Sequence, residues 1–284
     1  MASFKVSLLP FAPRLGDLEY NFEKSAEKIE AACDSGADFI CLPELSQTGY
    51  ILENLVSRIA LKKHDSIFDK IKKLSKNRAI MIGAILLDDD RFYNTMMVFQ
   101  NQELVRVQKK IYPPTYGMFY EARYYSAGEN LVSFDTPYGR AGILICEDSW
   151  HPVLVYALGM QRVSHVFVPS ASPNRNFHHA DEEGFASQKN WQRRMRVYAE
   201  SFGQFYYYVN RGGVEDGILF GARTFVVTAT GHFIENEQDY EVNSDDISSS
   251  RMMGGPFQEE KYTLNHRILN ESFDIRHREL KNIE

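Results

Sequence analysis

The chain begins with a strand, a helix and a second strand, as judged from the spacing of its apolar residues. An apolar run at 5–9 predicts the first strand, and apolar positions three and four residues apart predict a helix from Tyr20 to Gly36. The apolar run at 38–42 ends at a proline and has the form of a strand buried on both faces. Because a helix connects the two strands, we expect them to pair in parallel.

Strands and helices continue to alternate along most of the chain. Helices are predicted near 66–76, 153–160 and 185–202, and strands at 79–87, 92–99, 104–107, 141–145, 165–168, 205–209 and 224–228. The intervening loop, 110–130, is long and rich in aromatic residues and proline, which indicates a functional segment. After Gly231 the chain becomes polar, and one more strand is expected near 262–264. The pattern predicts a single α/β domain over residues 1–284.

Composition and charge exclude several classes of protein. Of the 284 residues, 44% are hydrophobic and 25% are charged, which argues against a disordered or fibrous chain. The net charge of −6 disfavours a dedicated nucleic-acid binder. No apolar stretch approaches the roughly 20 residues that a membrane-spanning helix needs. We therefore expect an unprocessed protein that binds neither nucleic acid nor a membrane.

The three cysteines, Cys33, Cys41 and Cys146, are the first candidates for chemistry. Their odd number and the lack of a close pair argue against a disulfide framework or a cysteine zinc site, and favour the cytoplasm. Cys33 and Cys41 fall on apolar faces, where free cysteine is usually an inert core residue. Cys146 follows an apolar strand, at a strand-to-helix turn where backbone N–H groups and the helix dipole are expected to lower its pKa.

Two charged residues also follow predicted strands, Glu44 and Lys110. In open α/β sheets, ligands bind beyond the carboxyl ends of the strands, and Cys146 and these two residues fall at or just past such ends. A carboxylate can remove the proton of a thiol, and an ammonium group can stabilise the oxyanion that forms when a thiolate attacks a carbonyl. Each residue taken alone is also typical of an ordinary strand end.

Three blocks of sequence around these residues resemble the catalytic blocks of the nitrilase (carbon-nitrogen hydrolase) superfamily. They are LPELSQTGY at 42–50, Lys110 followed by YGMFYE at 116–121, and CEDSW at 146–150. The blocks follow the order and spacing of the family, and the resemblance covers about residues 5–231. It implies a four-layer α-β-β-α sandwich that forms homodimers or larger assemblies. The polar C-terminal extension, 235–284, is expected to contribute to the contacts between copies.

The resemblance also implies a role for each matching residue. Glu44 would be the general base and Cys146 the nucleophile. Lys110 would stabilise the tetrahedral intermediate together with the backbone N–H that follows the cysteine. Glu121 matches a second glutamate of the family, which would orient Lys110 or the substrate. In that scheme the reaction passes through a thioester and needs no metal or organic cofactor.

The blocks look most like the glutamine-hydrolysing domain of glutamine-dependent NAD synthetases. Nitrilases usually carry tryptophan after the cysteine, so Glu147 argues for an amide substrate rather than a nitrile. The family positions that line the substrate pocket correspond here to Tyr50, Tyr116, Phe119 and Ser172, and His178 stands where the family places a basic residue that recognises the glutamine carboxylate. A Ser-Gly-Gly-x-Asp-Ser pyrophosphate loop does not occur, which implies a stand-alone hydrolase or a subunit that passes ammonia to another protein.

Several alternatives remain open at the level of sequence. The main hypothesis is an amidase that acts on a small linear amide. A glutaminase-type ammonia-donating subunit, an N-carbamoyl-amine hydrolase and a catalytically silent binding protein are the others. His178 and His179, with Asp181 and Glu182, resemble a metal cluster, but adjacent histidines rarely point at one ion, so a polar loop over the pocket is the preferred interpretation. The basic helical stretch 191–196 is interpreted as an exposed or interface face.

Overall fold

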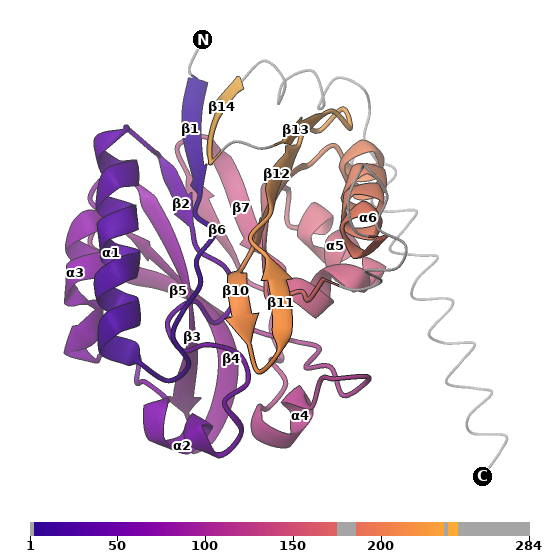
Figure 1. Cartoon of the computed structure of the whole chain (residues 1–284). Coiled ribbons are helices and arrows are strands. Elements are labelled where there is room, and N and C mark those ends of the chain that lie inside the picture. The colour runs from indigo at the N-terminus through magenta and orange to yellow at the C-terminus, as the bar shows by residue number, and fades with distance from the viewer. Residues whose placement is uncertain (1–2, 175–185, 236–237, 244–284) are drawn as a thin grey trace, which may run out of the picture.

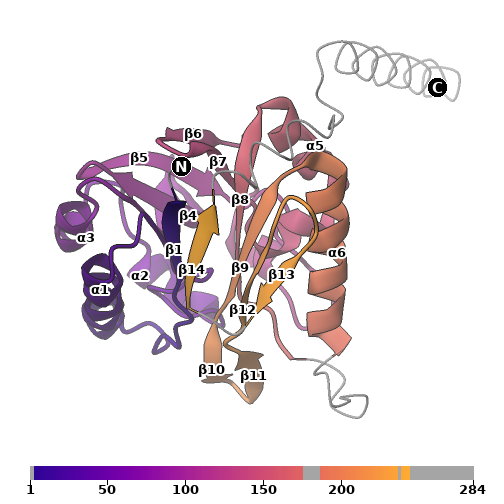
Figure 2. The ribbon, with the colours of Figure 1, turned by 90° about the horizontal axis from the view of Figure 1, so that it is seen from above.

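Two six-stranded sheets pack face to face, and helices cover the outer face of each (Figures 1 and 2). This arrangement is given by a computed structural model, which describes residues 3–174, 186–235 and 238–243. The predicted four-layer α-β-β-α sandwich, formed as a single α/β domain, is confirmed.

The first sheet has the strand order β14-β1-β2-β3-β4-β5. Its strands are β1 (Ser3–Leu8), β2 (Phe39–Cys41), β3 (Ala79–Asp88), β4 (Arg91–Gln100), β5 (Glu103–Lys109) and β14 (Asp239–Asn243). The predicted parallel pairing of β1 with β2 is confirmed, and β2 is also parallel to β3. Because β4 runs antiparallel to both β3 and β5, strands β2, β3 and β5 end at the same edge.

The second sheet has the strand order β13-β12-β9-β8-β7-β6. Its strands are β6 (Ser133–Thr136), β7 (Gly139–Ile143), β8 (Val163–Ser170), β9 (Phe205–Asn210), β12 (Thr224–Val227) and β13 (Phe233–Glu235). Strands β7, β8 and β9 are parallel, so their carboxyl ends also lie together. A separate hairpin, β10 (Gly212–Glu215) with β11 (Ile218–Gly221), follows β9 directly.

Apolar side chains fill the space between the sheets and the space under each helical layer. Helices α1 (Leu18–Asp34) and α3 (Asp69–Leu74) cover the first sheet, and α5 (Pro152–Met160) and α6 (Ala186–Phe202) cover the second (Figure 2). Between the sheets, buried residues such as Phe39 and Phe167 form the central core. The short helical segments are α2 (Val56–Ile59), α4 (Glu121–Tyr124), η1 (Glu53–Leu55), η2 (Ser66–Phe68) and η3 (Cys146–Trp150).

Several predicted boundaries were wrong. Strand β7 ends at Ile143, two residues earlier than expected, and the helix predicted from residue 66 starts as a 3-10 turn. The polar region after Gly231 was expected to lack strands before residue 262, yet it contributes β13 and β14. These two strands are short edge strands, and such strands bury too few side chains to leave an apolar run in the sequence. The strand expected near 262–264 lies outside the described residues.

Within the part of the chain that the structure describes, no helix is long and apolar enough to cross a membrane.

Candidate active site

The predicted catalytic residues meet where the carboxyl ends of the two sheets face each other. Glu44 follows β2, Lys110 directly follows β5, and Cys146 lies three residues after β7. Glu44 and Lys110 are almost completely buried, with 0% and 1% of their surface exposed, while Cys146 is half-buried. The carboxyl ends of strands from both sheets therefore bring these three residues together, and ligands were expected to bind beyond such ends.

The turn that carries Glu44 crosses over the neighbouring strand β3 at Gly83. A Cβ atom at Gly83 would lie 2.4 Å from the backbone nitrogen of Leu45 and 2.7 Å from the carbonyl oxygen of Pro43. The backbone of Gly83 also exchanges hydrogen bonds with this turn, since its carbonyl accepts from Gln47 N at 2.9 Å and its N–H donates to Ser46 Oγ at 3.1 Å. Glycine at this position allows Glu44 to pass over β3 and reach Lys110, three strands away.

Lys110 lies between two carboxylates. Its Nζ donates to Glu44 Oε1 and to Glu121 Oε1, each at 2.7 Å. Burial alone would lower the pKa of the Lys110 ammonium group, but the charges of Glu121 and Glu44 outweigh it and hold the pKa well above its ordinary value. Lys110 therefore remains a cation, fixed in place by two charge-assisted hydrogen bonds.

Glu121 and Asn94 complete the surroundings of this lysine. Asn94 Nδ2, on β4, donates to Glu44 Oε1 at 2.7 Å and to Glu121 Oε2 at 3.4 Å. The hydroxyl of Tyr50 also donates to Glu121 Oε1. Burial raises the pKa of Glu121, an effect that the Lys110 ammonium group opposes and the Glu44 carboxylate reinforces. These five side chains, those of Lys110, Glu44, Glu121, Asn94 and Tyr50, form one network in which two carboxylates share a single ammonium group.

Cys146 has a backbone conformation that residues other than glycine rarely adopt. Its φ is +46°, and such left-handed conformations cluster at functional sites. Asp148 holds this turn, because its carboxylate accepts from Ile145 N at 3.3 Å. The same carboxylate accepts from Ile111 N at 3.0 Å and Tyr112 N at 2.8 Å, which directly follow Lys110. Asp148 thus ties the Cys146 turn on one sheet to the Lys110 segment on the other.

The expectation of a lowered thiol pKa at Cys146 was wrong. Burial raises the pKa of Cys146 well above its ordinary value, the Glu44 charge adds to this, and Lys110 and the N–H of Ala171 act in the opposite direction. Loss of water around the sulfur outweighs the short helical turn. The resting thiol is neutral, so attack on a carbonyl requires a base. The N–H of Ala171 also donates to Glu44 Oε2 at 2.8 Å, which places that carboxylate beside the sulfur.

The other two thiols lie in the first sheet and its helices. Cys41 is completely buried, as expected, and burial raises its pKa far above the ordinary value. Cys33 was expected in the core but is only half-buried, on α1, and burial raises its pKa as well. The guanidinium group of Arg78 lowers the pKa of Cys33 and the carboxylates of Asp34 and Glu30 raise it, but burial is the largest effect, and for Cys41 burial acts alone.

We expect iodoacetamide at pH 7 to alkylate Cys146 at least about tenfold faster than Cys33 or Cys41, because Glu44 can remove its proton. Mass spectrometry of tryptic peptides over time would give the three rates. Glu44→Gln should slow the alkylation of Cys146, because the loss of the base outweighs the loss of the charge that raises the thiol pKa, and it should leave that of Cys33 unchanged. Equally slow labelling of all three cysteines would contradict the role assigned to this site.

Aromatic rings and a carboxylate lie next to the buried network. The ring of Phe119 is 6.1 Å from that of Tyr50 and 5.6 Å from that of Tyr116. The hydroxyl of Tyr116 donates to Glu147 Oε2 at 2.6 Å, and His151 Nε2 lies 3.7 Å from the other oxygen of Glu147. Four of the six predicted substrate-binding residues therefore form one continuous group.

Ser172 lies beyond the end of β8, one residue after Ala171. Its hydroxyl accepts from Trp191 Nε1 at 3.0 Å, and its backbone is fixed by two hydrogen bonds with the side chain of Asn210 at 2.8 and 2.9 Å. His178 lies outside the described residues, as do His179, Asp181 and Glu182 of the alternative metal cluster.

Three groups at this site escaped the sequence analysis. Asn94 is a buried amide in a strand whose other buried residues, apart from Thr95, are apolar or aromatic, and a buried polar group needs partners. Asp148 accepts from the backbone N–H of Ile145, three residues earlier, but Ile145 has no side-chain oxygen to complete a capping box, so the spacing gave no signal for it. The backbone N–H of Ala171 leaves no trace in the sequence. Burial raises the pKa of Asp148 to about 7, against the hydrogen bond from Tyr112.

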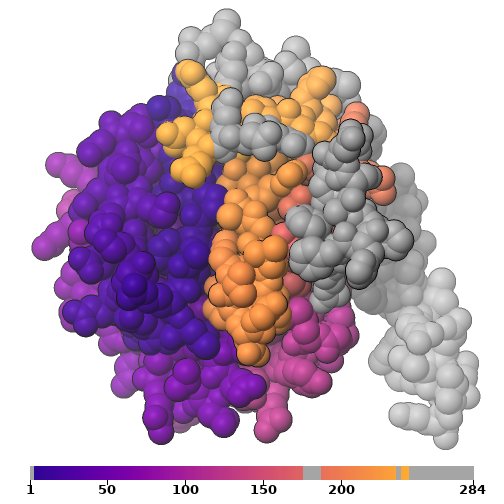
Figure 3. Space-filling view, in the orientation of Figure 1, coloured from indigo at the N-terminus to yellow at the C-terminus, as the bar shows by residue number. Residues whose placement is uncertain are grey.

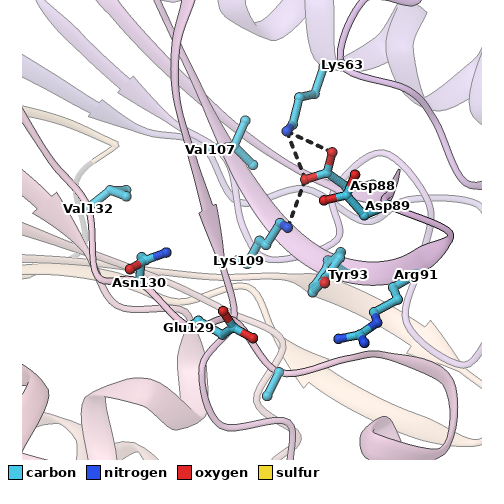
Figure 4. A pocket seen from close by; sticks show the side chains of 11 residues that line it. Lys63, Asp88, Asp89, Arg91, Tyr93, Val107, Lys109, Glu129, Asn130 and Val132 are labelled. Atoms are coloured by element: carbon cyan, nitrogen blue, oxygen red, sulfur yellow. Dashed lines mark hydrogen bonds and ion pairs between the residues drawn. The ribbon is translucent and has the colours of Figure 1, made fainter.

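Two clefts lie near these residues. One, with a volume of about 410 Å³, includes Tyr50, Glu121 and Ile218 among its lining residues. The other, of about 490 Å³, contains none of the predicted site residues (Figure 4). Its two lysines are already paired, since Lys63 and Lys109 lie 2.9 and 2.8 Å from Asp88. The first cleft borders the network through Tyr50 and Glu121, whereas Cys146, Glu44 and Lys110 are not among its lining residues, so we place the candidate site at the network itself.

Comparison with known proteins gives a consistent family. The sequence profile described as carbon-nitrogen hydrolase matches residues 5–252. Glutamine-dependent NAD(+) synthetase of Thermotoga maritima is 30% identical over 242 residues, which cover 82% of this chain and 40% of that protein. The same enzyme from Acinetobacter baylyi is 30% identical over 236 residues, covering 81% and 41%. The chain thus spans about two fifths of the length of these curated relatives.

Solved structures give the same result. Glutamine-dependent NAD+ synthetase from Acinetobacter baumannii superimposes with a TM-score of 0.77 at 27% identity, over 87% of this chain and 47% of that one. Nit3 from Saccharomyces cerevisiae, a member of branch 10 of the nitrilase superfamily, has a TM-score of 0.75 at 20% identity, over 91% and 96%. An amidase from Nesterenkonia sp. has a TM-score of 0.72 at 17% identity, over 92% and 95%. At these lower identities the likeness concerns the fold.

Proposed function

The chain belongs to the carbon-nitrogen hydrolase family, and on that premise we propose that it is an amidase. Its substrate is a small linear amide, which it cleaves through a cysteine thioester with release of ammonia or an amine. The observation that carries this proposal is the position of Lys110, whose Nζ lies 2.7 Å from Glu44 and from Glu121. A buried ammonium group next to a half-buried thiol and its base is what attack on an uncharged carbonyl needs.

Acylation uses Glu44 and Cys146 together. As the sulfur attacks the amide carbonyl, the S–H proton passes to the Glu44 carboxylate and a carbon–sulfur bond forms. The oxygen becomes an oxyanion, which the ammonium group of Lys110 and the backbone N–H of Glu147 stabilise. Collapse of this intermediate breaks the carbon–nitrogen bond, and the leaving nitrogen takes the proton from Glu44. The products of this half-reaction are ammonia or an amine and a thioester on Cys146.

Deacylation repeats the steps with water as nucleophile. Glu44 takes a proton from the water as its oxygen attacks the thioester, and the same groups stabilise the second oxyanion. The carbon–sulfur bond then breaks, the proton returns from Glu44 to the sulfur, and the carboxylic acid leaves. The raised pKa of the Cys146 thiol supports this scheme, because a thiol with a raised pKa needs a base beside it to become a nucleophile.

Glu147 supports a substrate that carries a positive charge away from its amide. Its carboxylate is 16% exposed, and the Tyr116 hydroxyl orients it at 2.6 Å. A carboxylate oriented by one hydrogen bond keeps free lone pairs for an ammonium group of the substrate. We propose that Glu147 binds such a group, and that Tyr50, Tyr116, Phe119 and Ser172 shape the rest of the pocket.

Ammonia release from a panel of compounds tests the reaction and the substrate class together. We expect turnover of glutamine or of short ω-amides, and Glu147→Gln should raise KM for substrates with an amino group by about tenfold while kcat stays within twofold. The reason is that the Glu147 carboxylate would bind the amino group of the substrate equally well in the ground state and in the transition state, so its loss weakens binding without slowing the chemical step.

The panel also includes N-carbamoyl amines and nitriles, and Glu103→Gln is the matched control because Glu103 is exposed on β5. Preferential turnover of N-carbamoyl amines would move the proposal to a hydrolase of that class. Turnover of nitriles alone would contradict the interpretation of Glu147. No turnover, together with slow labelling of Cys146, would favour a binding protein.

A glutaminase subunit that donates ammonia to another protein is the second candidate. It is favoured by the relatives, which are named glutamine-dependent. The same panel separates it from the first candidate, because glutamine would then be hydrolysed well above other ω-amides.

We further propose a cytoplasmic protein that assembles into homodimers or larger oligomers. Three free thiols support a reducing compartment. Light scattering coupled to size-exclusion chromatography would give the oligomeric state.

A further inference from the structure

A buried ion pair outside the reacting groups joins Arg211 and Glu215. Arg211 Nη1 lies 2.8 Å from Glu215 Oε2, and the two side chains are only 1% and 6% exposed. Arg211 follows β9, at the edge where Cys146 and Ala171 also lie, and Glu215 ends β10. Removing two charges from water costs free energy, and a buried ion pair often adds little net stability. Stability alone therefore does not explain why this pair is present.

The second oxygen of Glu215 holds the backbone of the turn that follows Glu44. Glu215 Oε1 accepts from Tyr50 N at 2.9 Å and from Ile51 N at 2.6 Å. The turn packs directly on this carboxylate at Gly49, where φ is +81° and a Cβ atom would lie 3.1 Å from Glu215 Oε2. Each oxygen of Glu215 therefore has its own partner, the guanidinium on one side and the Tyr50 turn on the other.

The hairpin also fixes the ring of Tyr50. The guanidinium of Arg211 lies 4.4 Å from the ring centre of Phe220, on β11, and that ring lies 6.3 Å from the ring of Tyr50. In Figure 3 the orange β10–β11 hairpin lies on the surface between the N-terminal half of the chain and the segment around α4. Tyr50 is thus held at its backbone by Glu215 and at its ring by Phe220.

We propose that Glu215, held by Arg211, is a positioning residue for Tyr50 and, through it, for Glu121 and Lys110. The connection is continuous, since the Tyr50 hydroxyl donates to Glu121 Oε1, and the same oxygen accepts from Lys110 Nζ at 2.7 Å. The inference rests on the proposed amidase function for its kinetic consequence. Its geometric part, the control of Lys110 and hence of the Cys146 thiol, does not depend on the substrate.

The test compares Glu215→Ala, Tyr50→Phe and the double variant in amide hydrolysis. We expect each single change to lower kcat by about 100-fold with KM within threefold, because a small displacement of a positioned group costs about that much. The double variant should lose no more than either single variant, since both changes break the same connection. Glu200→Ala is the matched control, because it removes the exposed Arg196–Glu200 pair of the same i, i+4 spacing.

Glu215→Gln keeps the shape of the side chain and decides the outcome if Glu215→Ala does not fold. The oxygen of an amide can accept a hydrogen bond but its NH₂ group cannot. Glu215→Gln therefore loses either the bond from Arg211 or the bonds from the backbone of Tyr50 and Ile51, and kcat should fall about tenfold. Wild-type kcat in Glu215→Gln, or losses that multiply in the double variant, would overturn the positioning role.

Alkylation of Cys146 by iodoacetamide gives a reading that needs no substrate. Lys110 holds Glu44, the base for this thiol, through the hydrogen bond of 2.7 Å to Glu44 Oε1, so displacement of Lys110 in the Glu215 variants should slow the alkylation about tenfold. If the wild-type protein hydrolyses no amide but the alkylation slows as expected, the proposed function fails and the positioning role stands. If the wild-type protein does hydrolyse amides but Glu215→Gln leaves the alkylation rate unchanged, the positioning role fails and the proposed function stands.

Discussion

Replacing Cys146 with alanine is expected to abolish amide hydrolysis, with kcat reduced at least about 10⁴-fold, because the variant has no atom that can form the thioester. Cys146→Ser should be nearly as inactive. A serine hydroxyl is far less acidic than a thiol, and the site already disfavours an anion at this position, since burial and the Glu44 charge raise the pKa of the thiol. Steady-state ammonia release, with mass spectrometry for a trapped acyl-enzyme, would measure both effects.

Cys33→Ser is the control for this experiment. Cys33 is half-buried on α1, with no contact to the network around Lys110, so its replacement should leave kcat within twofold of wild type. Substantial turnover by Cys146→Ala would remove this residue as the nucleophile, whatever the remaining geometry of the site.

Lys110→Met is expected to lose both activity and stability. Methionine fills a similar volume but leaves the Glu44 and Glu121 carboxylates buried without a cation, which costs about 3 to 5 kcal/mol of folding free energy. The oxyanion also loses its main counter-charge, so kcat should fall at least about 10³-fold. Lys70→Met, on an exposed lysine paired with Glu30, is the control for removing a lysine charge.

The loss of stability in Lys110→Met should depend on pH. Burial already raises the pKa of Glu121, and Lys110 opposes that effect, so the variant raises the pKa further. A carboxyl group whose pKa is higher in the folded state binds its proton more tightly there. The free energy of unfolding therefore falls as pH rises above the pKa of glutamate in the unfolded chain, about 4.3. The difference in Tm between variant and wild type should be larger at pH 8 than at pH 5. An equal difference at both pH values would contradict the buried carboxylate pair.

The sequence predicted that these residues follow the ends of strands. It did not predict the backbone path that brings them into contact. Parallel pairing follows from short apolar runs joined by helices, and Glu44, Lys110 and Cys146 were expected at or just past strand ends, but the order of the strands and their division into two sheets were not predicted. The passage of the Glu44 turn over Gly83 depends on a close approach of two backbones, which no spacing of residues reveals. The contact of Glu215 with the Tyr50 turn could not be predicted either, because Glu215 accepts a hydrogen bond from the backbone N–H of a residue 165 positions away in the sequence.

The direction of the Cys146 pKa shift shows a different limit. A local feature, the helical turn after the strand, predicted a lowered value. The outcome is set by the loss of water and by Glu44, which arrives from the other sheet, so it depends on tertiary packing that local sequence does not encode.

The pairing of β14 with β1 has a consequence for synthesis of the chain on the ribosome. Strand β1 is made first, but the hydroxyl of Ser7 meets its partner Asp239 only 232 residues later in the sequence. Until then one edge of β1 has no neighbour, and an open strand edge can pair with other chains. Folding of the first sheet is therefore completed late in translation, and until then β1 is a segment that a holding chaperone would shield.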